Sequence, residues 1–285
     1  MNRTAFTRVV EAITELGLQS FILLDKAEPE FETLDVLRSR GIRPQLIALV
    51  GISTGLIDYQ LSVGGATKLW KELEGITTQW GLSTLTDAKK CMGSLLSKSV
   101  SSQYNDQKAR RISKVFSSDL PQHVVDRFED CLKDPVKLWN MIAVAVGSSP
   151  EKKTIAFSMK VFDLAVFCCY GKYLEFSQEP PIAVDFHVRR MTEIMGLTSA
   201  GSSDDQIRHI WFEVALESSK KAMEQISPLR IDSLIWQSGL MLYDPLIRMH
   251  SKSRLPKLDE HLGRIGIDVR NRSSFMQLLQ SCSFA

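Results

Sequence analysis

The amino-acid sequence predicts an all-α fold on three observations. Apolar residues recur at the three-to-four-residue period of a helix in nearly every periodic segment, beginning with Phe6, Val9, Val10 and Ile13. The alternation that is typical of half-buried strands is scarce. The continuous apolar run "RPQLIALVGISTGLI", residues 43–57, has the length of a buried helix and exceeds that of an ordinary strand. We therefore expect about a dozen short helices and no substantial sheet.

The composition is that of a globular protein with a sizeable core. The chain has 285 residues, of which 44% are hydrophobic and 24% charged, enough for one large domain or two small lobes. No apolar run reaches the roughly 20 residues that cross a bilayer. The amphipathic, partly acidic start "MNRTAFTRVVEAITELG" is unlike a secretory signal. The formal net charge of +2 neither requires nor excludes nucleic acid, since a basic face can lie on a balanced protein.

Cysteine usage indicates reduced thiols inside a cell. The five cysteines have no zinc-like spacing, and an odd number with one adjacent pair does not suggest a disulfide framework. These cysteines are Cys91, Cys131, Cys168, Cys169 and Cys282.

Turn-forming residues divide the chain into short segments. Breaks are expected near residues 41–44, 63–65, 101–107, 117–121, 147–150, 177–181, 199–204 and 227–228. The last stretch, "RNRSSFMQLLQSCSFA", is expected to be only partly ordered. We therefore expect a domain over residues 1–260 and a C-terminal tail over residues 261–285.

A pair of helices joined by a short turn is expected over about residues 136–170. The apolar segment 136–146 predicts a helix that stops at Gly147. In the following "SPE", residues 149–151, serine is a good N-cap, proline fits the first helical position and glutamate suits the first turn. The second helix should therefore begin at about residue 150.

Lys153 falls in the first turn of this second helix. The partial positive charge of a helix N-terminus disfavours an ammonium there, and the neighbouring Lys152 adds repulsion. Both effects favour a neutral amine that could act as a nucleophile. The alternative is an exposed lysine in a solvated first turn, which is the commoner fate of such a residue.

Lys160 lies two helical turns beyond Lys153 and on roughly the same face. Its flanking residues are Phe157, Met159, Val161 and Phe162. The side chain either extends along this apolar surface to reach solvent or points into a polar pocket. The residues alone favour the route to solvent.

Asp185 follows a proline-led segment, "PPIAV", that forces an extended backbone. Its simplest role is to cap the helix expected over "FHVRRMTEIMG". In a second interpretation, this carboxylate faces Lys153, orients the amine, takes up its proton and stabilises positive charge on a sugar.

Three motifs together resemble the archaeal GO glycosylase family of the helix-hairpin-helix DNA glycosylase superfamily, whose members remove 8-oxoguanine from DNA. The motifs are "KKTIAFSMK" (152–160), "PIAVDFHVRRMT" (181–192) and "IDSLIW" (231–236). The segments "EPEF" near residue 30 and "LIDYQLSVGGATKLW" up to Trp70 agree with the same family, so the resemblance covers most of residues 1–245. It implies a two-lobed helical architecture in which the N- and C-terminal helices share one lobe and the active site lies in the cleft between the lobes.

The resemblance also implies roles for single residues. Lys153 matches the catalytic lysine and Asp185 the catalytic aspartate. Four other positions match residues that hold the extruded base, namely Trp70, Lys160, Asp232 and Trp236. Asp232 and Trp236 are four residues apart, so on a helix that follows "SP" (227–228) they share a face.

A tryptophan is also a common core residue. Core packing is the better interpretation for Trp139 and Trp211, and Trp70 after a Gly-Gly turn could be a plain surface anchor.

Glu30 departs from the family pattern, which has a glutamine at the matching position. An amide donates and accepts hydrogen bonds, whereas an ionised carboxylate only accepts. 8-Oxoguanine differs from guanine by an N7–H donor and an O8 acceptor. Glu30 could accept from this N7–H or could point to solvent, which leaves open another oxidised purine as the substrate.

The resemblance implies base excision followed by strand cleavage. The nucleotide leaves the stack, Lys153 attacks C1′, and a Schiff base and β-elimination follow, with no redox cofactor and no catalytic metal. The implied partner is double- or single-stranded DNA containing 8-oxoguanine. We expect a monomer in the cytoplasm or nucleoid that does not bind membranes.

DNA phosphates are expected at the hairpin turn, where a helix start offers N–H groups. Candidate basic contacts are Lys108, Arg110, Arg111, Lys114, Arg189, Arg190, Arg248, Lys252 and Arg254. Two interpretations compete with the enzyme: a non-catalytic helix-hairpin-helix DNA-binding protein, and an all-helical interaction domain in which Lys153 is exposed and Asp185 only caps a helix.

Overall fold

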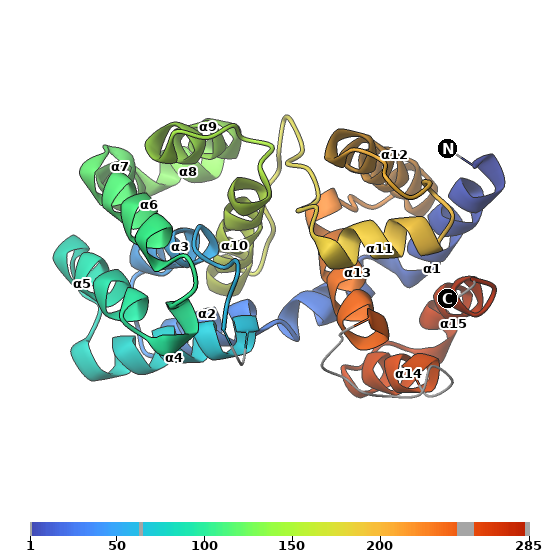
Figure 1. Ribbon diagram of the computed structural model, residues 1–285, viewed down its shortest axis with the longest axis horizontal. Helices are drawn as coiled ribbons and strands as arrows, with labels where there is room; N and C mark the ends of the chain where they lie inside the picture. Colours follow the sequence, from blue (N-terminus) through green and yellow to red (C-terminus); the bar gives the residue numbers. More distant parts are fainter. Residues whose placement is uncertain (1, 63–64, 244–253, 283–285) are drawn as a thin grey trace. The chain divides into compact units, whose positions relative to one another are not determined.

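A computed structural model describes residues 2–62, 65–243 and 254–282. Within these ranges the chain forms helices numbered α1 to α15 and one short 3-10 helix, with no strand (Figure 1). The all-α prediction is therefore confirmed, with more helices than the expected dozen. No helix in the described ranges combines the length and apolar character needed to span a bilayer.

The chain divides into two compact units. The terminal unit comprises Met1–Ala27 and Pro181–Ala285, and the central unit comprises Glu28–Pro180. The N- and C-terminal helices thus belong to one unit, and an uninterrupted central segment forms the other.

The central unit is built around α3, which packs against α10 and α2. Every residue from Leu46 to Gly55 is buried, so the apolar run in this segment is a core helix as predicted. The helices of this unit are α2 (Pro29–Ser39), α3 (Pro44–Gly55), α4 (Gly65–Trp80), α5 (Leu85–Leu96), α6 (Asn105–Ser117), α7 (Leu120–Asp126), α8 (Phe128–Lys133), α9 (Pro135–Val146) and α10 (Lys153–Tyr170).

The predicted hairpin is formed by α9 and α10. Gly147 ends α9 in the left-handed region at φ 69°, and the Ser148 N–H closes the turn on the Ala143 carbonyl at 2.9 Å. The expected helix start at about residue 150 is wrong, because α10 begins at Lys153. The Ser149 carbonyl, which would accept the first hydrogen bond of a helix begun at Pro150, instead accepts the Lys152 N–H in a turn at 3.2 Å, and the Pro150 carbonyl accepts the indole N–H of Trp139 at 2.9 Å.

The terminal unit packs five later helices around and beside α1. Trp211 lies fully buried in its core, as predicted, with its indole N–H donating to the Thr192 hydroxyl at 2.8 Å. The helices of this unit are α1 (Arg3–Lys26), α11 (Phe186–Ile194), α12 (Asp204–Ala222), α13 (Pro228–Tyr243), α14 (Arg254–Arg264) and α15 (Val269–Gln280).

The structure differs from the expected C-terminal tail over residues 261–285. Helix α15 packs on α1, and Phe275 and Leu279 are fully buried in the core of the terminal unit. The helical spacing of the apolar residues in "SFMQLLQ" accounts for this packing, because it gives α15 one apolar face. The chain therefore contributes to this unit at least as far as Gln280.

Gly239 allows α13 to approach α11 closely. A Cβ at this position would lie 2.6 Å from Cβ of His187, well inside van der Waals contact. We expect Gly239→Ala to lower the free energy of unfolding by about 1–3 kcal/mol, because α11 would have to move away. Urea unfolding measures the stability of this variant and of the control Gly93→Ala on α5, where nothing lies within 4 Å of the added methyl group. Equal stability of the two variants would contradict the close packing.

Candidate active site

Lys153 is the first residue of α10, in the first helical turn as predicted, and its side chain is partly buried. Lys152 precedes it as the exposed N-cap and provides no side-chain hydrogen bond to the helix. The Lys153 amine therefore lies at the positive end of the helix dipole.

Lys160 is buried and forms an ion pair, so the expected path to solvent is wrong. Its Nζ lies 2.9 Å from Oε1 of Glu28, and both side chains are only 2% exposed. Glu28 precedes α2, and α2 packs directly on α10. The ammonium is held inside the unit by this carboxylate, in the polar-pocket arrangement that was the alternative.

Glu30 is 3% exposed, so the alternative in which it points to solvent is wrong. Its Oε2 has no hydrogen-bond partner among the described residues. Burial raises the pKa of the Glu30 carboxyl well above its ordinary value, and the negative charges of Glu28 and Asp58 raise it further. Lys160 acts in the opposite direction, but more weakly.

Trp70 is fully buried in the core of the central unit. Its indole N–H donates to Oδ2 of Asp58 at 2.9 Å. Burial raises the pKa of Asp58 to about 6, against the lowering effect of the Trp70 hydrogen bond and of the charges on Lys153, Lys108 and Lys160. In this conformation the Trp70 ring has no open face, so stacking on a base requires the groups that cover it to move.

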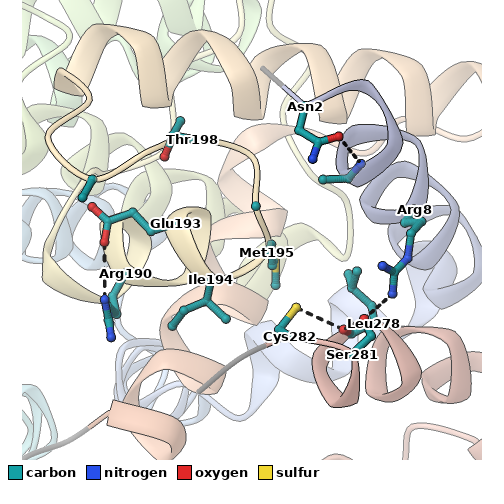
Figure 2. A pocket seen from close by; sticks show the side chains of 13 residues that line it. Asn2, Arg8, Arg190, Glu193, Ile194, Met195, Thr198, Leu278, Ser281 and Cys282 are labelled. Atoms are coloured by element: carbon teal, nitrogen blue, oxygen red, sulfur yellow. Dashed lines mark hydrogen bonds and ion pairs between the residues drawn. The ribbon is translucent and has the colours of Figure 1, made fainter. Parts of the chain in front are cut away.

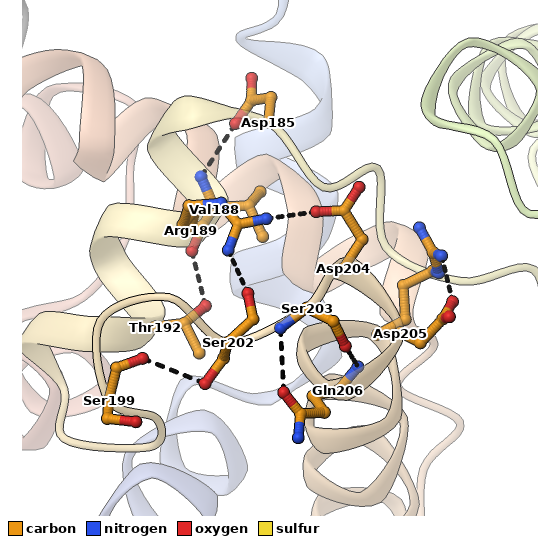
Figure 3. Close-up of polar contacts among 11 residues, drawn as sticks. Asp185, Val188, Arg189, Thr192, Ser199, Ser202, Ser203, Asp204, Asp205 and Gln206 are labelled. Atoms are coloured by element: carbon orange, nitrogen blue, oxygen red, sulfur yellow. Dashed lines mark hydrogen bonds and ion pairs between the residues drawn. The ribbon is translucent and has the colours of Figure 1, made fainter.

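Asp185 is the N-cap of α11, as predicted. Its Oδ1 accepts the N–H of Val188 at 2.9 Å, and Figure 3 shows this cap at the start of the helix. Arg189 in the next turn forms an ion pair with Asp204 and donates to the Ser202 carbonyl. The position of the Asp185 carboxylate is thus fixed by its own helix.

Asp232 and Trp236 lie on α13, as predicted. Asp232 is buried and Trp236 is partly buried. The first turn of this helix is fixed by a buried network in which Arg230 and Ser233 both donate to Asp25 of α1. Such a network gives the helix one register against α1.

Each unit therefore carries part of the predicted site. The central unit gathers four predicted residues, namely Lys153, Lys160, Glu30 and Trp70, around two carboxylates that the sequence did not single out. The terminal unit carries the other three, Asp185, Asp232 and Trp236. Glu28 and Asp58 lie within the segments that carry the resemblance, but no spacing rule connects either of them with residues more than 90 positions away.

The candidate phosphate contacts occupy different environments. Lys108 is fully buried and donates to the Gln60 carbonyl at 3.3 Å, and Arg111 donates to the Leu56 carbonyl and the Thr154 hydroxyl. Lys114 is exposed and its Nζ reaches the Val146 carbonyl at 3.2 Å, beside the hairpin turn.

Among the remaining basic candidates, Arg110 is exposed, while Arg189, Arg190 and Arg254 are partly buried. Arg190 lies 3.6 Å from Glu193, and Arg254 donates to the Leu242 carbonyl. Arg248 and Lys252 lie outside the described residues.

A cavity of about 480 Å³ lies in the terminal unit between α1, α15 and the end of α11 (Figure 2). Arg8, Arg190 and Cys282 line it, but Asp185, Asp232 and Trp236 do not. It is therefore separate from the predicted site. In the described ranges, no group of three or more His, Cys, Asp or Glu side chains is arranged to hold a metal ion, and none of the five cysteines forms a disulfide.

Comparison with known proteins shows which family this chain resembles. A sequence model of the AGOG family, described as N-glycosylase/DNA lyase, matches residues 10–265. Proteins named N-glycosylase/DNA lyase from Thermococcus kodakarensis and Pyrobaculum aerophilum are 25% and 22% identical, over 82% and 81% of this chain and 84% and 85% of their own lengths. The crystal structure of the 8-oxoguanine DNA glycosylase of P. aerophilum, in complex with 8-oxoguanosine, superimposes with a TM-score of 0.70 at 20% identity, covering 96% of each chain. Since the family match spans nearly the whole chain, this protein belongs to the AGOG family of N-glycosylase/DNA lyases.

Proposed function

We propose that this protein excises 8-oxoguanine from DNA and cleaves the strand at the resulting site. The observation that carries the proposal is the position of Lys153 at the start of the hairpin helix α10, on the same unit as a buried group of polar side chains. A nucleophilic amine beside buried polar side chains is what attack on a sugar and recognition of a base require. The P. aerophilum relative, an 8-oxoguanine DNA glycosylase, supports the choice of base.

The proposed reaction begins with extrusion of the damaged nucleotide from the helix. The neutral amine of Lys153 forms a bond to C1′, and the bond between C1′ and N9 breaks as the base leaves with the electron pair and takes up a proton. Asp185 stabilises the positive charge that develops on the sugar and orients the amine. The sugar ring then opens to a Schiff base. Loss of a C2′ proton and departure of the 3′ phosphate complete β-elimination.

The proposed base contacts are hydrogen-bonding groups and aromatic rings. Lys160 and Glu30 in the central unit, and Asp232 in the terminal unit, provide hydrogen-bonding groups for the purine edge. Trp236 and Trp70 are the proposed stacking rings. Because the structure covers Trp70 completely, its use requires a local rearrangement when the base arrives. Stacking is worth about 1–3 kcal/mol per base, enough to offset part of the cost of extrusion.

The proposed DNA backbone contact is the hairpin turn over residues 147–152, where Lys114 lies beside the end of α9. A helix start and an exposed ammonium both favour a phosphate. The substrate would be duplex or single-stranded DNA bound by a monomer. We place the protein with the DNA of the cell, in the cytoplasm or nucleoid.

Incubation with a duplex that contains one 8-oxoguanine tests the function. The expected products are the free base and a strand cut on the 3′ side of the lesion. Release of another oxidised purine in its place would favour the alternative substrate. Tight binding without release of any base would support the non-catalytic DNA-binding interpretation and contradict the proposal.

A further inference from the structure

Three carboxyl groups, those of Glu28, Glu30 and Asp58, lie close together in the central unit, but they do not all have a positively charged or hydrogen-bonding partner. Glu28 has the buried ammonium of Lys160 at 2.9 Å. Asp58 accepts from the Trp70 indole at 2.9 Å and lies in the field of Lys153, Lys108 and Lys160. Glu30 has no ion pair among the described residues, and its Oε2 is buried without a hydrogen-bond partner. One oxygen of Glu28 is likewise buried without a hydrogen-bond partner among the described residues, but Glu28 has the Lys160 ammonium, whereas Glu30 has no ion pair.

The charges around Glu30 oppose its ionisation. The charged groups that act on it are two carboxyls, Glu28 and Asp58, and one ammonium, Lys160, and a hydrogen bond from its own backbone lowers its pKa less strongly than any of them. That ammonium is already neutralised by its contact with Glu28. A second negative charge at 3% exposure would lack both water and a counter-ion, which is costly. Burial together with the two negative neighbours raises the pKa of Glu30 well above the usual carboxyl range.

We propose that Glu30 is a neutral carboxylic acid that recognises 8-oxoguanine through two adjacent hydrogen bonds. This inference rests on the proposed function and names the chemistry by which one residue selects the base. In this proposal the ligand supplies the hydrogen-bond partner that the buried Oε2 of Glu30 lacks among the described residues, since buried polar atoms are normally hydrogen-bonded.

A neutral carboxylic acid presents one donor, the O–H, beside one acceptor, the carbonyl oxygen. 8-Oxoguanine presents the complementary pair, because its N7–H donor lies between the acceptors O6 and O8. Guanine offers acceptors at both O6 and N7, so it can take only the O–H hydrogen bond. An ionised Glu30 could accept from N7–H but would repel O6 and O8. The neutral form therefore makes two hydrogen bonds to 8-oxoguanine and only one to guanine.

The binding of the damaged base should consequently depend on pH. A base that covers Glu30 removes the remaining water and disfavours the carboxylate further, so binding favours the protonated form. Affinity should be full below the raised pKa of Glu30 and should fall as pH rises through it. Asp58, with a pKa of about 6, acts on Glu30 through its charge, so the two carboxyls titrate together, and only the Asp58 part of the pH dependence remains when Glu30 is replaced.

Binding of 8-oxoguanosine by the full chain, measured by calorimetry across the pH range, tests the proposal. Glu30→Gln keeps a donor beside an acceptor and has no proton to lose. We expect the affinity of the wild type for 8-oxoguanosine to fall at least about tenfold between slightly acidic and alkaline pH, because one buried hydrogen bond is lost. The affinity of Glu30→Gln should change much less over the same range. Glu32→Gln, an exposed neighbour on α2, should follow the wild type.

Two results would overturn the proposal. The first is that binding to Glu30→Gln depends on pH in the same way as binding to the wild type. If the wild type nevertheless releases 8-oxoguanine from a duplex, only the role of Glu30 is contradicted and the proposed function stands. The other is an infrared spectrum of the wild type at neutral pH without the carbonyl band of a protonated acid, a measurement that does not depend on the variant's folding. If neither protein binds the nucleoside at any pH, the proposed substrate fails together with the role of Glu30.

Discussion

Lys153→Gln should abolish the covalent protein–DNA adduct that borohydride traps on duplex DNA containing 8-oxoguanine. Glutamine has a similar length and is tolerated at the start of a helix, but its amide nitrogen is not a nucleophile. Removing the group that forms the covalent bond should lower the rate of strand cleavage by at least about a thousandfold, as for other nucleophiles. Gel electrophoresis of the trapped adduct and of the cut strand provides both measurements.

The neighbouring Lys152 provides the matched control. It is an exposed lysine one position earlier, and it shares the helix start with Lys153. Lys152→Gln should retain the adduct, because the trapped amine is that of Lys153. Binding of 8-oxoguanosine to Lys153→Gln should also persist, which separates loss of chemistry from loss of the fold. An undiminished adduct in Lys153→Gln would contradict the assignment of the nucleophile.

The sequence patterns of neighbouring residues predicted where helices form better than they predicted contacts between segments that are far apart in the sequence. The apolar run of α3 and the Gly147 end of α9 follow from period and turn chemistry, which are properties of neighbouring residues. The start of α10 does not, since the turn before it includes a contact with another helix, in which the Trp139 indole of α9 donates to the Pro150 carbonyl. Neighbouring residues alone do not contain this contact.

The candidate site shows the same division. The N-cap role of Asp185 and the shared helix of Asp232 and Trp236 follow from positions within four residues of one another. The burial of Lys160 does not follow from its neighbours, because its partner Glu28 is 132 residues away. Apolar neighbours on α10 suggested a side chain that reaches water, whereas the folded chain supplies a carboxylate inside.

Asp185→Asn should leave the protein folded and reduce base excision by roughly a hundredfold to a thousandfold, the usual cost of removing one group that stabilises developing charge. Asparagine is as good an N-cap as aspartate, so the hydrogen bond from the Val188 N–H should persist. The substitution therefore removes the negative charge and keeps the structural contact. Single-turnover release of 8-oxoguanine and urea unfolding measure the two effects separately.

Two further variants separate the cap from the chemistry. Asp185→Ala removes both functions and should additionally cost about 1 kcal/mol in the free energy of unfolding. Asp268→Asn changes another aspartate N-cap of the terminal unit, at the start of α15, and should leave both stability and excision close to wild type. If Asp185→Asn remains fully active while Asp185→Ala is only destabilised, Asp185 is a cap alone. A large loss of excision in Asp185→Asn at unchanged stability instead means that one carboxylate fixes the start of α11 and acts on the sugar, because the helix that it caps holds the charge in place.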